Sequence, residues 1–138
     1  MEKPIRQPAV IVFVCEHGSA KSVVAAAHFN KLARERDMNL RAVSRGTNPD
    51  EEIAPKASER LQADGLAVGG EKPRKLSAAD AAGAIRIITF CQLPESHSNA
   101  APVEMWTDIP PVSESYGKAR DAIVERIKRL LDELKSPK

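Results

Sequence analysis

The sequence predicts an α/β fold of three layers, with helices on both faces of a central parallel sheet of about four strands. Short apolar runs alternate with longer segments whose apolar residues recur at helical spacing. The first run is followed by a glycine-containing loop and an alanine-rich segment, the start of a right-handed β-α-β crossover. The 138 residues and their 42% apolar content suit one core, so we expect a single domain over residues 1–138.

The expected elements alternate along the chain. They are strands over 10–15, 40–44, 85–90 and 103–107, and helices over 23–36, 50–64, 77–83 and 113–134. The first strand is an unbroken apolar run rich in strand-forming residues, and the helix after it has small residues on the side facing the sheet. The second helix begins or is interrupted near Pro55 and ends before Gly65. Ser77 and Asp80 form a capping box for the short third helix, and the last helix carries a continuous apolar stripe.

The loop between the first strand and the first helix contains the strongest functional signal. It consists of Cys15, Glu16, His17, Gly18, Ser19, Ala20, Lys21 and Ser22. The first N–H groups of a helix have no partner within it and its dipole is positive there, so an anion is stabilised. Gly18 permits a positive φ angle that turns the loop amides inward, and Lys21 adds a full charge.

The same field favours the thiolate form of a cysteine. We therefore interpret the residues from Glu16 to Lys21 as an oxyanion-binding loop with Cys15 as the nucleophile at its floor. The alternative is that Cys15 merely ends a buried strand as a small apolar residue. The polar loop and the helix directly behind it favour the nucleophile.

These loop residues resemble the active-site loop of the low-molecular-weight protein tyrosine phosphatases and of the arsenate reductases built on the same fold. The pattern of that loop is Cys, five residues, Arg, then Ser or Thr. The segments 40–47, 53–65 and 85–91 resemble the family's second strand, second helix and third strand. The resemblance implies a phosphatase-like α/β/α fold in which Cys15 attacks phosphorus and Ser22 hydrogen-bonds its thiolate.

Two departures from the family pattern affect the expected chemistry. Lys21 stands where the family has arginine, whose planar fork binds two oxygens, and losing one charge-assisted hydrogen bond costs roughly 1.5–3 kcal/mol. The family's Asp-Pro acid is replaced by a segment from Trp106 to Pro111. Within it Asp108 is the candidate general acid and base, with a turn-forming role as the alternative. Measured from Trp106, the family's acid falls nearer Pro110.

Cys91, directly after the third expected strand, matches one resolving cysteine of the arsenate reductases that use a cysteine relay. Their second resolving cysteine lies seven residues further on, where this chain has Ser98. A complete intramolecular relay is therefore absent, because serine forms no disulfide. Cys91 remains either a redox partner for Cys15 or an inert thiol at the end of a strand.

The leading hypothesis is a cysteine-dependent phosphatase that hydrolyses a phosphomonoester, for instance on a phosphotyrosine protein, through a phosphocysteine intermediate. The alternative is an arsenate reductase in which Cys15 works with Cys91 or an external thiol such as thioredoxin or glutathione. A third hypothesis is a catalytically weak protein that binds phosphate or another oxyanion. None of the three needs a cofactor.

Composition excludes several other classes of function. The net charge is +2, with 21 basic and 19 acidic residues spread along the chain, so we expect neither nucleic acid nor a membrane as partner. Three histidines and two cysteines without the paired ligand spacing of a metal centre give a metal site little support. Two distant cysteines and no signal-like segment predict a reduced, cytoplasmic protein. Arg45, in the loop after the second strand, is expected to be solvated.

Overall fold

The computed structural model of the chain describes residues 8–66, 72–93 and 101–135. Its strands are β1 (Ala9–Cys15), β2 (Leu40–Gly46), β3 (Ala84–Thr89) and β4 (Val103–Met105). Its helices are α1 (Lys21–Glu35), α2 (Pro55–Ala63), α3 (Ala78–Gly83) and α4 (Tyr116–Lys135). The strands form one sheet in the order β2-β1-β3-β4, and every neighbouring pair is parallel. The predicted fold class is confirmed.

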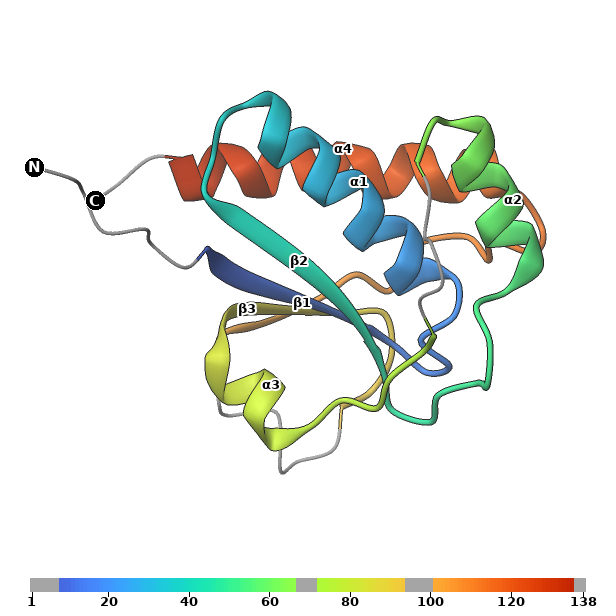
Figure 1. The fold of residues 1–138 in the computed structure, drawn as a ribbon, viewed down its shortest axis with the longest axis horizontal. Helices are drawn as coiled ribbons and strands as arrows, with labels where there is room; N and C mark the ends of the chain where they lie inside the picture. Colours follow the sequence, from blue (N-terminus) through green and yellow to red (C-terminus); the bar gives the residue numbers. More distant parts are fainter. Residues whose placement is uncertain (1–7, 67–71, 94–100, 136–138) are drawn as a thin grey trace, which may run out of the picture.

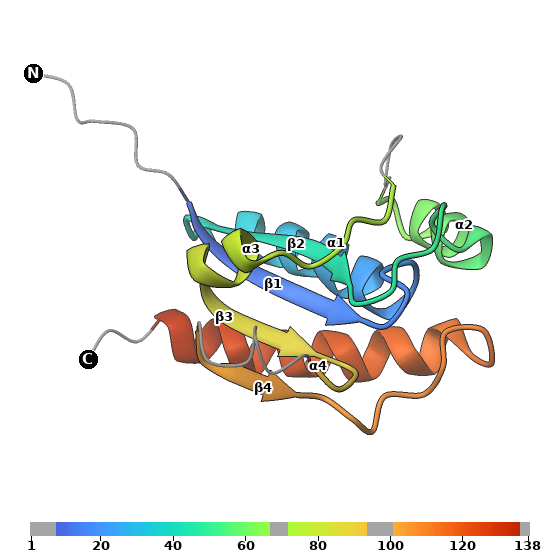
Figure 2. The same cartoon turned by 90° about the horizontal axis from the view of Figure 1, so that it is seen from below.

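Helices cover both faces of the sheet, as Figures 1 and 2 show: α1 and α4 lie on one face and α3 on the other. β1 is one of the two inner strands, and it is packed on both faces. Its residues alternate, with Ile11 and Phe13 in the core on the α1 and α4 side and Val12 and Val14 in the core on the α3 side. All four are fully buried, which explains the unbroken apolar run, since a parallel strand covered on both faces has no solvent side.

The larger core is built on aromatic contacts between the sheet and the helices. Phe13 packs against Phe29 of α1 and against Trp106, with ring centroids 5.8 Å apart in both pairs. The predicted apolar stripe of α4 closes this core. Its buried residues are Tyr116, Ala119, Ile123, Ile127, Leu130 and Leu131.

Several element boundaries differ from the sequence prediction by two or more residues, and two of them flank the segment between β2 and α2. Of the two starts that the sequence allowed for the second helix, the structure has the one at Pro55 and not the one at Asp50, and β2 extends two residues further, to Gly46. The N–H groups of the segment between them bind the loop after β1 instead of starting a helix. A long-range contact thus overrides the local helical pattern. The capping box of Ser77 and Asp80 is present as predicted.

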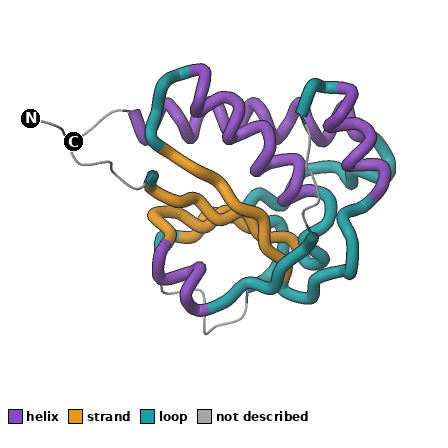
Figure 3. The backbone as a smooth tube through the Cα atoms, viewed as in Figure 1, coloured by secondary structure: helices purple, strands orange, loops and turns teal. Residues whose placement is uncertain are grey.

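The carboxyl ends of the parallel strands lie at one edge of the sheet, and the connecting loops gather there (Figure 3). In α/β sheets this edge is the usual place for a ligand site. Across the described ranges, no helix has the length and apolar character that crossing a membrane requires.

Candidate active site

The loop from Cys15 to Ser19 is held by its carbonyl groups. The carbonyls of Cys15, Glu16, His17 and Ser19 accept hydrogen bonds from the N–H groups of Thr47, Asn48, Asp50 and Ala54, at 3.2, 2.7, 3.0 and 2.9 Å respectively. The Ser19 hydroxyl also donates to Asp50 at 3.0 Å. The segment after β2 therefore binds one side of the loop backbone and fixes its shape.

The N–H groups of the same loop take no part in these contacts. Among the described residues, none of the N–H groups from Glu16 to Ala20 donates to a protein acceptor. The helix that follows adds its first amides, which have no acceptor within α1. The carbonyl groups of the loop are therefore hydrogen-bonded to the segment after β2, whereas its N–H groups have no acceptor among the described residues. Several backbone N–H groups of this kind, close together in a loop, can bind an anion.

Gly18 and Gly46 make this loop shape possible. Gly18 has a φ of +61°, a conformation that side chains rarely allow. A Cβ atom built on Gly18 would lie 2.9 Å from the backbone nitrogen of Gly46, and one on Gly46 would lie 2.8 Å from the nitrogen of Gly18. The loop therefore packs backbone to backbone on the end of β2.

A chain of hydrogen bonds leads from the thiol into the protein. The Sγ atom of Cys15 lies 3.0 Å from the hydroxyl of Ser22, which in turn lies 2.7 Å from the hydroxyl of Ser44 on β2. Ser22 is fully buried and Cys15 is 8% exposed. The Ser22 hydroxyl thus contacts the sulfur and can donate a hydrogen bond to a thiolate, while the Ser44 hydroxyl contacts Ser22 from behind.

A cavity of about 320 Å³ opens over this sulfur. Cys15, the loop residues around Glu16 and His17, and Lys21 line one side of it, and Cys91 lines the other. Cys91 is held at the end of β3 by Thr89, whose hydroxyl accepts from its N–H at 3.1 Å and donates to its carbonyl at 2.7 Å. Both thiols of the chain are free and face the same cavity.

Asp108 is not brought to this cavity. Its carboxylate forms an ion pair with Arg126 of α4, and its side chain is 70% exposed. Arg126 also lies over the Trp106 ring, 5.8 Å from its centroid. The buried tryptophan therefore helps to position the guanidinium that binds the Asp108 carboxylate. The same segment lines the cavity with Pro111 instead, so this arrangement gives Asp108 no access to a bound substrate.

Arg45 also differs from expectation. It is not solvated, because its Nε atom lies 2.9 Å from Asp80 and its side chain is only 17% exposed. The sequence prediction missed Ser44 and the wall formed by Lys56, Phe90 and Val112, which lines the cavity above Cys15. Ser44 alone had a signal, as a hydroxyl on the same face of the strand as the apolar Leu40 and Ala42. The wall residues come from the first turn of α2 and from the segments after β3 and before α4, and they had none.

The described residues contain no cluster of three or more histidine, cysteine or acidic side chains arranged to hold a metal ion.

Comparison with known proteins places this geometry in a family. Three solved structures with a closely similar fold are those of YfkJ from Bacillus subtilis, a low molecular weight protein tyrosine phosphatase from T. tengcongensis, and an arsenate reductase from Archaeoglobus fulgidus DSM 4304. Their TM-scores are 0.81, 0.79 and 0.68 at 18%, 19% and 28% identity. The matches cover 93%, 91% and 88% of this chain and 95%, 99% and 98% of the others.

No curated protein sequence matches the chain significantly. The family model described as low molecular weight phosphotyrosine protein phosphatase does match, over residues 10–109. That range runs from the first residues of β1, through the cysteine loop and β2, to the segment after Trp106, so it contains every part of the cavity floor. The chain therefore belongs to the low molecular weight phosphotyrosine protein phosphatase family.

Proposed function

We propose that this chain is a cysteine-dependent phosphatase that hydrolyses phosphomonoesters through a phosphocysteine on Cys15. The observation that carries the proposal is the position of the Cys15 sulfur, 3.0 Å from the Ser22 hydroxyl and beneath a cavity bordered by free loop amides. A thiolate there is stabilised by a hydrogen-bond donor and by the positive end of α1. Membership of the family supports the same chemistry.

In the first step the sulfur attacks phosphorus, so that an S–P bond forms as the bond to the ester oxygen breaks. The loop amides and the Lys21 ammonium stabilise the charge on the three equatorial oxygens. The leaving oxygen departs as the oxyanion and takes its proton from water. In the second step water attacks phosphorus, the S–P bond breaks, and phosphate and the thiolate are released.

The leaving group decides which esters react, because Asp108 is paired with Arg126 and does not line the cavity. Glu16 is the carboxyl group that does line it, on an exposed side chain. Without a buried acid, an ester whose alcohol is itself acidic reacts best. We therefore propose aryl phosphates, the chemical class of phosphotyrosine, as the preferred substrates.

The test is turnover of an aryl phosphate such as p-nitrophenyl phosphate, compared with an alkyl phosphate, by the purified protein. Cys15→Ser serves as the blank. We expect aryl hydrolysis that disappears in Cys15→Ser, and Lys21→Arg should raise kcat/KM by about one to two orders of magnitude. If the wild-type protein turns over no ester but phosphate raises its melting temperature, a role in oxyanion binding replaces this proposal.

A second candidate function is favoured by Cys91, which lines the same cavity as Cys15. In arsenate reduction Cys15 attacks arsenic and displaces hydroxide. The Cys91 thiolate then attacks the Cys15 sulfur, the S–As bond breaks with its electron pair on arsenic, and arsenite leaves behind a Cys15–Cys91 disulfide. An external thiol, from thioredoxin or glutathione, reduces that disulfide. The similarity to the Archaeoglobus fulgidus arsenate reductase supports this candidate.

Cys91→Ser separates the two candidate functions. Hydrolysis of an aryl phosphate needs only Cys15 and is expected to survive the substitution. Reduction of arsenate with thioredoxin needs both thiols and should be lost. A Cys91→Ser protein that still reduces arsenate at the wild-type rate with thioredoxin would exclude Cys91 as the resolving thiol.

A further inference from the structure

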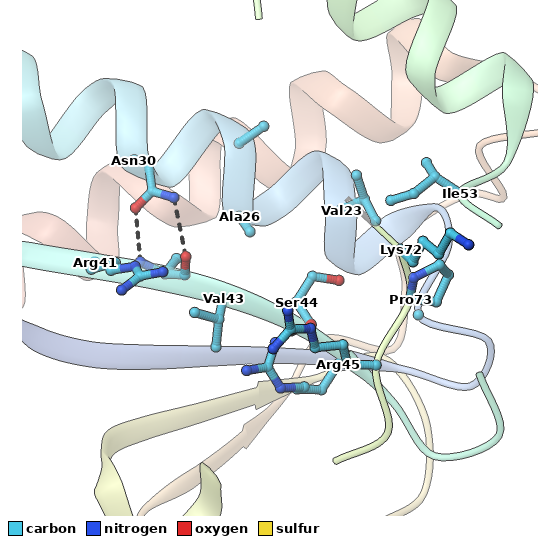
Figure 4. A pocket seen from close by; sticks show the side chains of 14 residues that line it. Val23, Ala26, Asn30, Arg41, Val43, Ser44, Arg45, Ile53, Lys72 and Pro73 are labelled. Carbon is cyan, nitrogen blue, oxygen red and sulfur yellow. Dashed lines mark hydrogen bonds between the residues drawn. The ribbon is translucent and has the colours of Figure 1, made fainter. Parts of the chain in front are cut away.

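A second cavity, of about 300 Å³, lies on the other side of the cysteine loop. Figure 4 shows it along the outer edge of β2, between α1 and the segment around Lys72 and Pro73. Apolar side chains of α1 and Ile53 line one wall. It shares Gly18 with the loop but contains neither Cys15 nor Lys21, so it is distinct from the proposed active site.

β2 is an edge strand, and most of the backbone groups on its free edge are satisfied by the protein. The Asn30 side chain accepts from the N–H of Ala42 at 2.8 Å and donates to its carbonyl at 3.1 Å, a pair drawn as dashed lines in Figure 4. The N–H of Gly46 donates to Arg74, and its carbonyl accepts from Leu76. Asn30 and residues 74–76 therefore act as substitutes for a neighbouring strand.

Ser44 lies between these two paired positions. The N–H and C=O of alternate strand residues point to the same side, so those of Ser44 face the cavity as do those of Ala42 and Gly46. Its carbonyl accepts from the Arg45 guanidinium at 2.8 Å. Its N–H has no acceptor within the part of the chain that the structure describes. The cavity thus contains a backbone donor that has no partner among the described residues.

The charged side chains that line this cavity are all basic. They are Arg41, Arg45, Lys72 and Arg74. Asp80 neutralises part of the Arg45 charge from outside the cavity. Between the described residues no ion pair involves Arg41, Lys72 or Arg74. A concave site with basic walls and no acidic one favours a ligand with several negative charges.

We propose that this cavity is a second anion site, which binds a small ligand carrying two or more phosphate charges. The Ser44 N–H donates to one phosphate oxygen, and Arg41 and Lys72 neutralise the charges at either end of the cavity. The volume suits a diphosphate group, and the apolar wall of α1 leaves room for an organic substituent.

The site is coupled to the proposed nucleophile through one residue. The Ser44 hydroxyl is hydrogen-bonded to Ser22, which contacts the Cys15 sulfur. A ligand on the Ser44 N–H fixes the backbone that carries this hydroxyl. Occupancy of the second site is therefore expected to alter the reactivity of Cys15 without contact between the two ligands.

The probe is inorganic pyrophosphate, titrated into ¹⁵N-labelled full-length protein at physiological ionic strength and followed by NMR. We expect saturable shifts of the Ser44 backbone amide and of the Asn30 side-chain amide. Shifts of amides 16–21 report binding at the cysteine loop separately, so the two sites are distinguished in one titration. Arg41→Gln/Lys72→Gln should weaken binding at Ser44 about tenfold and leave the loop shifts unchanged.

Lys118→Gln/Lys128→Gln is the matched control, because it removes the same charge from exposed positions of α4. The control should bind like the wild-type protein. Equal weakening in both variants, or shifts confined to amides 16–21, would overturn the second site. Because Arg41 and Lys72 are exposed, both variants are expected to fold, and Arg74→Gln provides an independent single substitution.

Discussion

The hydroxyl of Ser44 lies 2.7 Å from that of Ser22, although the two serines are 22 residues apart and belong to different elements. This contact joins β2 to the first turn of α1 directly behind the Cys15 sulfur. Ser44 does not touch the cavity over Cys15. It is therefore a positioning residue, which orients the hydroxyl that faces the thiol.

Ser44→Ala is expected to lower kcat/KM for an aryl phosphate about tenfold, because one hydrogen bond that orients Ser22 is lost. The rate of Cys15 alkylation at neutral pH should fall as well, a change that a purely structural role would not cause. Ser58→Ala on α2 is the control and should leave both rates unchanged. Wild-type alkylation in Ser44→Ala would show that Ser22 holds its orientation unaided.

Gly18→Ala and Gly46→Ala are each expected to destabilise the protein by about 2–4 kcal/mol, since each added Cβ meets opposing backbone that cannot move aside. Gly83→Ala is the matched control, because nothing lies within 4 Å of its Cβ position and its φ is not positive. Urea unfolding measures all three variants. If Gly18→Ala were no less stable than Gly83→Ala, the close packing of the loop on β2 would be wrong.

Asp108→Asn is expected to change kcat for an aryl phosphate by less than about threefold, because this carboxylate pairs with Arg126 rather than lining the cavity. The exposed ion pair contributes little, so stability should change by less than about 1 kcal/mol. Steady-state kinetics at neutral pH provide the measurement. A loss of two orders of magnitude would mean that the segment turns Asp108 toward the substrate during the reaction.

The environment of His28 makes the stability of the protein depend on pH. Burial lowers the pKa of this histidine, as do Lys31 and Arg120, and together they outweigh Asp64, which raises it. Its Nε2 lies 3.4 Å from the hydroxyl of Tyr116, which donates to Asp64 at 2.6 Å. The neutral imidazole therefore donates to the tyrosine oxygen, and the folded state resists protonation of His28.

The unfolded chain protonates His28 near the ordinary value, and the folded chain only at a lower pH. Between those two pH values the unfolded state binds more protons, so stability falls as the pH falls. Each unit by which the pKa is lowered corresponds to about 1.4 kcal/mol. Urea unfolding at about pH 7.5 and pH 5.5 should show a loss in the wild-type protein that is smaller in His28→Gln. Parallel losses in the two proteins would exclude His28 as the source.

Interactions between neighbours in the sequence were predictable. The apolar run of β1, the capping box at Ser77 and the stripe of α4 each depend on residues close in sequence, so their patterns could be read directly. The start of α2 was only bracketed, between Asp50 and Pro55. The residues before Pro55 have a helical pattern, but their N–H groups bind the carbonyls of the cysteine loop, a contact that no local pattern encodes.

The amino-acid sequence alone determined the sheet, the family resemblance, and the placement of Cys15 between a buried strand and a helix, because these depend on periodicity and on one short motif. Only the tertiary structure decided which distant side chains meet around that cysteine. It brought Ser44 to Ser22 and Cys91 to the cavity, and it turned Asp108 to Arg126. Side-chain direction at the ends of strands depends on packing against other elements, and that packing exists only once the chain has folded.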